Sequence, residues 1–174
     1  MVMGLGNTLQ RVLKHCWRDA SDVCHAVPAD LLARLAGRVS ASEQRHTGEI
    51  RICVEAGLPL SYLWRNAPAR ERAVTLFGKL RVWDTEHNNG VLIYLLLADH
   101  AIELVADRGV DARVSPAEWQ AMVAHLGTAL QAGQYEDGLT AALEEVSAVL
   151  VQHFPRLPGD VQRNELPNAP VLVN

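Results

Sequence analysis

The sequence predicts an α/β fold: a three-layer α/β/α sandwich with a small mixed central β-sheet, built from a parallel strand pair plus an antiparallel hairpin and flanked by helices. Residues 91–98 are the longest apolar run and are rich in Val, Ile and Leu, which is typical of a strand buried on both faces. Residues 49–55 alternate between apolar and polar side chains, as a second strand would. Residues 115–132 and 139–154 have the spacing of amphipathic helices that cover a sheet.

Length and composition restrict the class of protein. A chain of 174 residues is long enough for one domain with its own core. The net charge of −4, without a basic stripe, argues against a nucleic-acid binder. No stretch has the roughly 18 apolar residues of a membrane span, and the N-terminus does not read as a signal peptide, so we expect a cytoplasmic protein. Three cysteines without a Cys-x-x-Cys motif indicate free thiols.

Helices are expected around the first strand. Residues 7–25 have helical spacing of apolar side chains, and Pro28 suits the first position of a second helix that runs towards His46. The apolar stretch 57–68 is expected to pack over the sheet as a short helix, with a contact surface as the alternative. A further helix from about Ala69 leads to the central strand.

The connections predict the order of the strands. About 34 residues, largely helical in pattern, join strand 49–55 to strand 91–98, which predicts a right-handed parallel crossover. A short turn then leads to a strand over 102–107, which predicts an antiparallel hairpin. The apolar strand is therefore expected in the middle of the sheet. Strand 49–55 is expected nearer an edge, with one face partly exposed to solvent.

The chain divides into three regions. We expect an N-terminal helical extension over 1–27, the α/β domain over 28–154, and an extended or disordered tail over 155–174. The tail contains four prolines and little periodicity, which favours irregular structure. Its last apolar residues, 170–173, could add to a sheet edge or dock on a partner, but a frayed terminus is the favoured interpretation.

Polar side chains are predicted to meet at one edge of the sheet. The two parallel strands begin at that edge, at Glu49 and Gly90, and the antiparallel strand ends there at Asp107. Because Ca²⁺ and Mg²⁺ prefer carboxylate and amide oxygens, we expect a divalent-cation site at this edge. Its predicted metal ligands are Glu49, Asp84, Glu86, Asn88, Asn89 and Asp107. Residues predicted to bind a small anionic ligand are His46, His87 and Arg108.

Each part of this set also has a purely structural explanation. Asp84 and Thr85 could cap a turn, the segment 88–90 could be chosen for left-handed backbone angles, and residues 107–108 could be a surface ion pair. No nucleophile elbow, phosphate-binding loop or zinc-protease motif is present in the sequence. The sequence therefore leaves open whether the chain is an enzyme.

Four segments carry a resemblance to a known family: residues 42–51, 80–99, 102–110 and 133–139. Together they resemble the TPM-domain family, in particular its soluble proteobacterial branch, over about residues 28–154. The resemblance implies an α/β/α sandwich; some members are described as binding divalent cations, and a plant lumen member as an acid phosphatase. The family's usual Gly-aromatic-Gly segment after the third strand is Asp107-Arg108-Gly109 here, so only its last glycine is kept.

Three functions are compatible with these patterns. The leading expectation is a soluble TPM-like binding or regulatory module for Ca²⁺, Mg²⁺ or a small anionic ligand. The first alternative is a metal-assisted acid phosphatase, in which Asp84 or His87 handles protons and Arg108 holds a phosphoryl oxygen. The second alternative is a protein-interaction module or homo-oligomer that uses residues 58–64 and the tail. None of these functions involves nucleic acid or membrane insertion by this chain.

Overall fold

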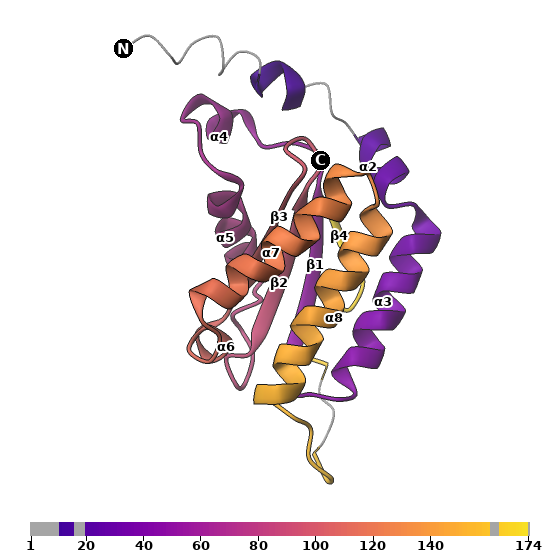
Figure 1. Ribbon diagram of the computed structural model, residues 1–174, viewed down its shortest axis with the longest axis vertical. Helices are drawn as coiled ribbons and strands as arrows, with labels where there is room; N and C mark the ends of the chain where they lie inside the picture. The colour runs from indigo at the N-terminus through magenta and orange to yellow at the C-terminus, as the bar shows by residue number, and fades with distance from the viewer. Residues whose placement is uncertain (1–10, 16–19, 161–163, 174) are drawn as a thin grey trace.

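The structure, a computed structural model, describes residues 11–15, 20–160 and 164–173 (Figure 1). The predicted helix over 7–25 lies partly outside this range; residues 11–15 are helical, and α2 follows. In chain order the elements are α2 (Ala20–Ala26), α3 (Ala29–Glu43), β1 (Glu49–Glu55), α4 (Leu60–Trp64), α5 (Ala69–Lys79), β2 (Gly90–Leu96), β3 (Ala101–Ala106), α6 (Arg108–Asp111), α7 (Pro116–Gln131), α8 (Tyr135–His153) and β4 (Val171–Val173).

The sheet confirms the predicted mixed topology and adds a strand. Its order is β3-β2-β1-β4, with β1 parallel to β2 from the pair Glu49–Gly90 onward and β2 antiparallel to β3. Every residue of β2 is buried, as its apolar composition predicts. The sheet is thus a parallel pair plus a hairpin, extended on the β1 side.

The added strand, β4, comes from the C-terminal tail. It runs parallel to β1 and pairs Val171 with Cys53, and the main-chain N–H of Ala56 donates to the carbonyl of Val173 at 3.1 Å. Arg51 holds the segment that precedes β4, because its guanidinium donates hydrogen bonds to the carbonyls of Pro167 and Ala169. The favoured interpretation of a frayed terminus was therefore wrong. The open edge of β1 offers unpaired main-chain groups that the apolar tail satisfies.

The position of β1 also differs from the prediction. It has a neighbour on both sides, and its polar face is buried, with Cys53 at 0% and Glu55 at 1% exposure. Glu55 accepts hydrogen bonds from the Arg72 guanidinium of α5 at 2.6–3.0 Å and from the Tyr94 hydroxyl of β2 at 2.6 Å. A buried carboxylate is tolerated when a cation and a donor surround it. The alternation of apolar and polar side chains in β1 therefore reflects a buried ion pair between the sheet and α5, and not a face exposed to solvent.

Helices cover the sheet on both faces and form the expected three layers (Figure 1). One core lies between the sheet and α3, α7 and α8, and includes Leu35, Ile93 and Leu126. The other lies under α4 and α5, and includes Leu63 and Leu92. No helix in the part of the chain that the structure describes has the length and apolar character needed to cross a membrane.

Helix boundaries follow their caps. The segment Ser115-Pro116-Ala117-Glu118 predicts a capping box at the start of α7, and the box is present. Ser115 Oγ accepts from the Glu118 N–H at 3.3 Å, and the Glu118 carboxylate accepts from the Ser115 N–H at 2.8 Å. Pro28 occupies the cap of α3, one position before the expected first turn. The apolar stretch 57–68 packs as predicted through Leu63 of α4, although the Trp64 side chain remains 73% exposed.

Candidate functional site

The candidate site lies at the edge of the sheet where β1 and β2 begin and β3 ends. Glu49 pairs with Gly90 at the start of the parallel pair, and the N–H of Asp107 donates to the Gly90 carbonyl at 2.8 Å. The strand ends therefore meet as the topology predicts. The side chains predicted to form one site, however, divide into four environments.

Glu49 lies under the C-terminal tail. Its carboxylate is 4% exposed and accepts hydrogen bonds from the main-chain N–H groups of Glu165 at 3.3 Å and Leu166 at 3.2 Å. Burial raises the pKa of this carboxyl, because the charged form loses its hydration. Glu86, in the loop before β2, contacts the same tail: its N–H donates to the Glu165 carboxylate at 2.8 Å. These contacts hold the tail over the start of β1.

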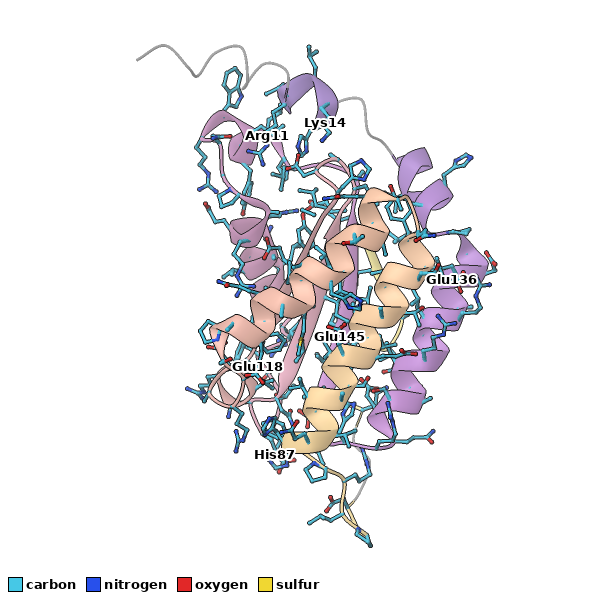
Figure 2. All side chains as sticks on the ribbon, viewed as in Figure 1. Arg11, Lys14, His87, Glu118, Glu136 and Glu145 are labelled. Atoms are coloured by element: carbon cyan, nitrogen blue, oxygen red, sulfur yellow. The ribbon has the colours of Figure 1, made fainter. Side chains whose placement is uncertain are left out.

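Asp84 and His87 lie at the surface of the loop before β2. The Asp84 carboxylate pairs with Arg81 at 2.6 Å, and both residues are exposed. Figure 2 shows His87 at the end of the molecule where this loop turns towards β2. An exposed pair of this kind contributes little stability. The carboxylate of Asp84 is thus engaged in a surface ion pair with Arg81, an alternative that the sequence suggested for residues 107–108 and not for Asp84.

Asn88, Asp107 and Arg108 are brought together. Asn88 adopts a left-handed backbone with φ of 52°, and its side-chain oxygen accepts from Arg108 Nε at 3.0 Å. Asp107 caps the short helix α6: its Oδ1 accepts from the Arg108 N–H at 2.7 Å. Its other carboxylate oxygen, Oδ2, is buried and has no hydrogen-bond partner. Such an oxygen is costly unless something else satisfies it.

Gly109 permits the close approach of the loop to α6. Its N–H donates to the Asn88 carbonyl at 3.0 Å. A Cβ at this position would lie 2.5 Å from that oxygen and 2.9 Å from the His87 carbonyl oxygen. Two main-chain carbonyls therefore face the residue that follows Arg108, close to Asp107. Glycine is therefore the residue that this contact requires at position 109.

Asn89 and His46 have internal structural partners. Asn89 is buried and its amide donates to the Thr47 hydroxyl at 3.3 Å. His46 is buried beneath α3 and α8; its Nδ1 lies 3.0 Å from the Gly48 carbonyl, so Nδ1 carries the proton and Nε2 accepts from the Ser42 hydroxyl at 2.8 Å. Burial lowers the pKa of His46 to about 4. The neutral ring links α3 to the residue that precedes β1.

Sequence reasoning missed two carboxylates near this edge, Glu43 and Glu165. Glu43 is 4% exposed, accepts from the Ile50 N–H at 3.1 Å, and has its pKa raised to about 8, chiefly by burial and also by the nearby Glu49 charge. A signal existed for Glu43, because it extends the buried stripe of α3 through Leu35 and Val39. None existed for Glu165, since its position depends on the path of the tail.

Within the described ranges, no group of three or more His, Cys, Asp or Glu side chains is arranged to hold a metal ion. A cation at this edge would therefore depend on carbonyl and amide oxygens together with a single carboxylate. The part that fits this chemistry is the region where the loop of residues 85–89 contacts Arg108 and Gly109, next to Asp107.

Comparisons with known proteins agree with the fold. A family model described as the TPM domain matches residues 22–149. The NMR structure of the BA42 protein from the psychrophilic bacterium Bizionia argentinensis has a TM-score of 0.72 at 25% identity, over 84% of this chain and 94% of that one. The N-terminal domain of a protein from P. gingivalis has a TM-score of 0.58 at 18% identity, over 76% and 83%. The latter shows the fold alone. No curated protein matches the chain.

Proposed function

The chain belongs to the TPM-domain family, and we propose that it is a binding module that takes up one divalent cation, Ca²⁺ or Mg²⁺, where Asp107 meets the loop of residues 85–89. The observation that carries this proposal is the buried Asp107 Oδ2, which has no hydrogen-bond partner. A cation is the natural partner for a desolvated carboxylate oxygen that no donor satisfies.

The surroundings of Asp107 support an oxygen-rich site. The carbonyl oxygens of His87 and Asn88 lie against Gly109, two positions along the chain from Asp107, and the Asn88 side chain reaches the same helix start. Ca²⁺ accepts carbonyl, amide and carboxylate oxygens in a flexible arrangement. With Asp107 as the single charged ligand, we expect binding in the range of about 10⁻⁴ to 10⁻³ M, as in other sites of low ligand charge.

The other residues of the predicted cation set have different roles in this proposal. Glu49 holds the tail through two main-chain N–H groups, and Asp84 pairs with Arg81. Arg108 orients Asn88 by its bond to the side-chain oxygen. Binding of a small anionic ligand and metal-assisted phosphatase activity stay predictions, as do the proteobacterial branch and the cytoplasmic location.

Asp107→Asn tests the proposal because it removes the charge while keeping the shape of the side chain and its ability to cap α6. Calorimetric titration of the wild type with CaCl₂ should give saturable heat, and Asp107→Asn should weaken binding about ten-fold or more, because ligand charge sets the affinity of such sites. Amide resonances of Asn88 and Gly109 should shift during the same titration.

Asp84→Asn is the matched control. Asp84 is the same residue type in the same region, but it is exposed and paired with Arg81, so its substitution should leave the calcium affinity unchanged. Two results would overturn the proposal: no binding heat from the wild type at about 10 mM calcium, above the weakest affinities expected of such sites, or equal affinity in wild type and Asp107→Asn.

A further inference from the structure

A groove follows the outer edge of β3, the end strand of the sheet that the tail does not cover. It encloses a cavity of about 460 Å³. Its floor is formed by β3, and its walls come from α5 on one face of the sheet and α7 on the other. The lining residues used below are Arg70, Glu103, Ala106, Asp111, Trp119 and Ala124.

The floor of the groove presents main-chain groups. Asp107 donates to Gly90 across the hairpin, and opposite residues in an antiparallel pair alternate between hydrogen-bonded and non-bonded positions. The N–H and C=O groups of Ile102, Leu104 and Ala106 therefore point away from β2, and of these three residues Leu104 and Ala106 line the groove. The Leu104 carbonyl confirms this direction, because it accepts a hydrogen bond from the Arg70 guanidinium.

The two walls differ in character. On the α7 side, Trp119 and Val123 are partly buried apolar side chains that pack against the core cluster to which Leu104 belongs. The indole nitrogen of Trp119 is buried without a hydrogen-bond partner. On the α5 side, Arg70 lies 3.7 Å from the Glu103 carboxylate and is half exposed. A strand laid along β3 would therefore meet an apolar wall and a charged wall at alternate residues.

The charges lining the groove sum to one negative charge. Arg70 and Glu103 offset each other as an ion pair, and the exposed Asp111 lies at the end of the groove near Ala106. A positively charged side chain on a molecule bound in the groove would complement the charge of Asp111. The cavity is the size of a typical small binding site, which accommodates a few side chains of an extended segment.

We propose that this groove binds an extended peptide of a partner protein, which adds to β3 as a fifth strand. Its alternate side chains are apolar where they face Trp119, and it carries a Lys or Arg that reaches Asp111. Main-chain hydrogen bonds to residues 102, 104 and 106 give affinity, and the two walls give specificity, as in other cases of strand addition to a sheet edge. Arg70 covers the edge when no peptide is bound, which protects it from non-specific pairing.

A displayed library of random peptides, selected against the full chain, tests this proposal. Enriched peptides should alternate apolar and polar residues and contain a basic residue. A synthetic copy of the most enriched peptide should shift the amide resonances of Ile102, Leu104 and Ala106. A version N-methylated at alternate residues that pair with β3 should lose binding, because it lacks the main-chain donors.

Two alanines of α7 provide a matched pair of variants. Both Ala121 and Ala124 are exposed, but only Ala124 lines the groove. Ala124→Arg should lower the affinity for the selected peptide about ten-fold or more, equivalent to about 1.4 kcal/mol of binding free energy. Ala121→Arg should leave that affinity unchanged. Failure to enrich any peptide, equal binding by Ala124→Arg, or shifts that map outside β3 would each overturn the proposal. So would a concentration-dependent dimer that Ala124→Arg abolishes, since a second copy would then be the occupant.

Discussion

Gly90 illustrates at the residue scale how closely the loop before β2 approaches the sheet. A Cβ at this position would lie 2.0 Å from the Val82 carbonyl oxygen. The contact is with backbone, so a rotamer change cannot relieve it. Gly90 therefore lets residues 82–89 return across the start of β2, where Glu86 contacts Glu165 of the tail and Asn88 contacts Arg108.

Gly90→Ala should destabilise the protein by about 1–3 kcal/mol, the usual cost of overpacking. Gly37, inside α3, is the control: nothing lies within 4 Å of a Cβ there, so Gly37→Ala should stabilise the protein by about 0.5–1 kcal/mol through helix propensity. Urea unfolding of both variants measures the two effects. Changes of the same sign would contradict this account of Gly90.

Asp84 and Asp107 show where residue-level prediction ends. Both were predicted as ligands on the same chemical argument, and the structure places one on the surface with Arg81 and the other at a helix cap with a buried oxygen. The difference depends on the direction of each side chain relative to a loop with a left-handed Asn88. Residue type and spacing do not encode that direction.

At the scale of elements, the two edges of the sheet differ. The edge at β1 is covered by β4, a three-residue strand from the tail. The edge at β3 is flanked by helices, and Arg70 donates a hydrogen bond to its Leu104 carbonyl. Exposed strand edges tend to pair with other chains. Covering one edge with the chain's own terminus leaves β3 as the edge open to a partner.

Removal of residues 170–174 should lower the melting temperature and promote self-association. The deletion takes away the pairing of β4 with β1 and exposes the edge of a strand whose residues are otherwise almost wholly buried. Thermal unfolding followed by circular dichroism and sedimentation velocity measure the two effects. Arg51→Gln is the milder companion change, because it loses contacts to the tail but keeps β4. A truncated chain that melts like the wild type and stays monomeric would show that β4 adds nothing to the fold.

For the whole molecule, buried titratable groups determine how stability depends on pH. Burial raises the pKa of Glu43 to about 8, so the folded state retains a proton that the unfolded chain releases. Stability from Glu43 is present below pH 4.5, its ordinary value, and is lost as the pH rises through 8. His46 acts in the opposite sense: its pKa is lowered from 6.5 to about 4, so stability is lost as the pH falls from 6.5 to 4.

These opposing effects offset each other between pH 4.5 and 6.5, and Glu43 dominates above that range. We expect the free energy of unfolding to fall by about 2 kcal/mol between pH 6.5 and 8, since one proton changes stability by roughly 1.4 kcal/mol per pH unit. Glu43→Gln should remove most of this fall. Glu118→Gln, an exposed change that can retain the capping box, should leave the fall unchanged. An undiminished fall in Glu43→Gln would contradict the assignment.

The sequence by itself determined the class of fold, the buried central strand, the parallel crossover, the hairpin and the capped helix α7. These features depend on local periodicity, on the length of connections and on caps, all of which are written in neighbouring residues. It also located the edge where the strand ends meet. Only the tertiary structure decided that Glu55 pairs with Arg72 inside the protein, that the tail closes the sheet, and which predicted ligands share an environment. These outcomes depend on contacts between segments far apart in the chain, whose geometry no local pattern specifies.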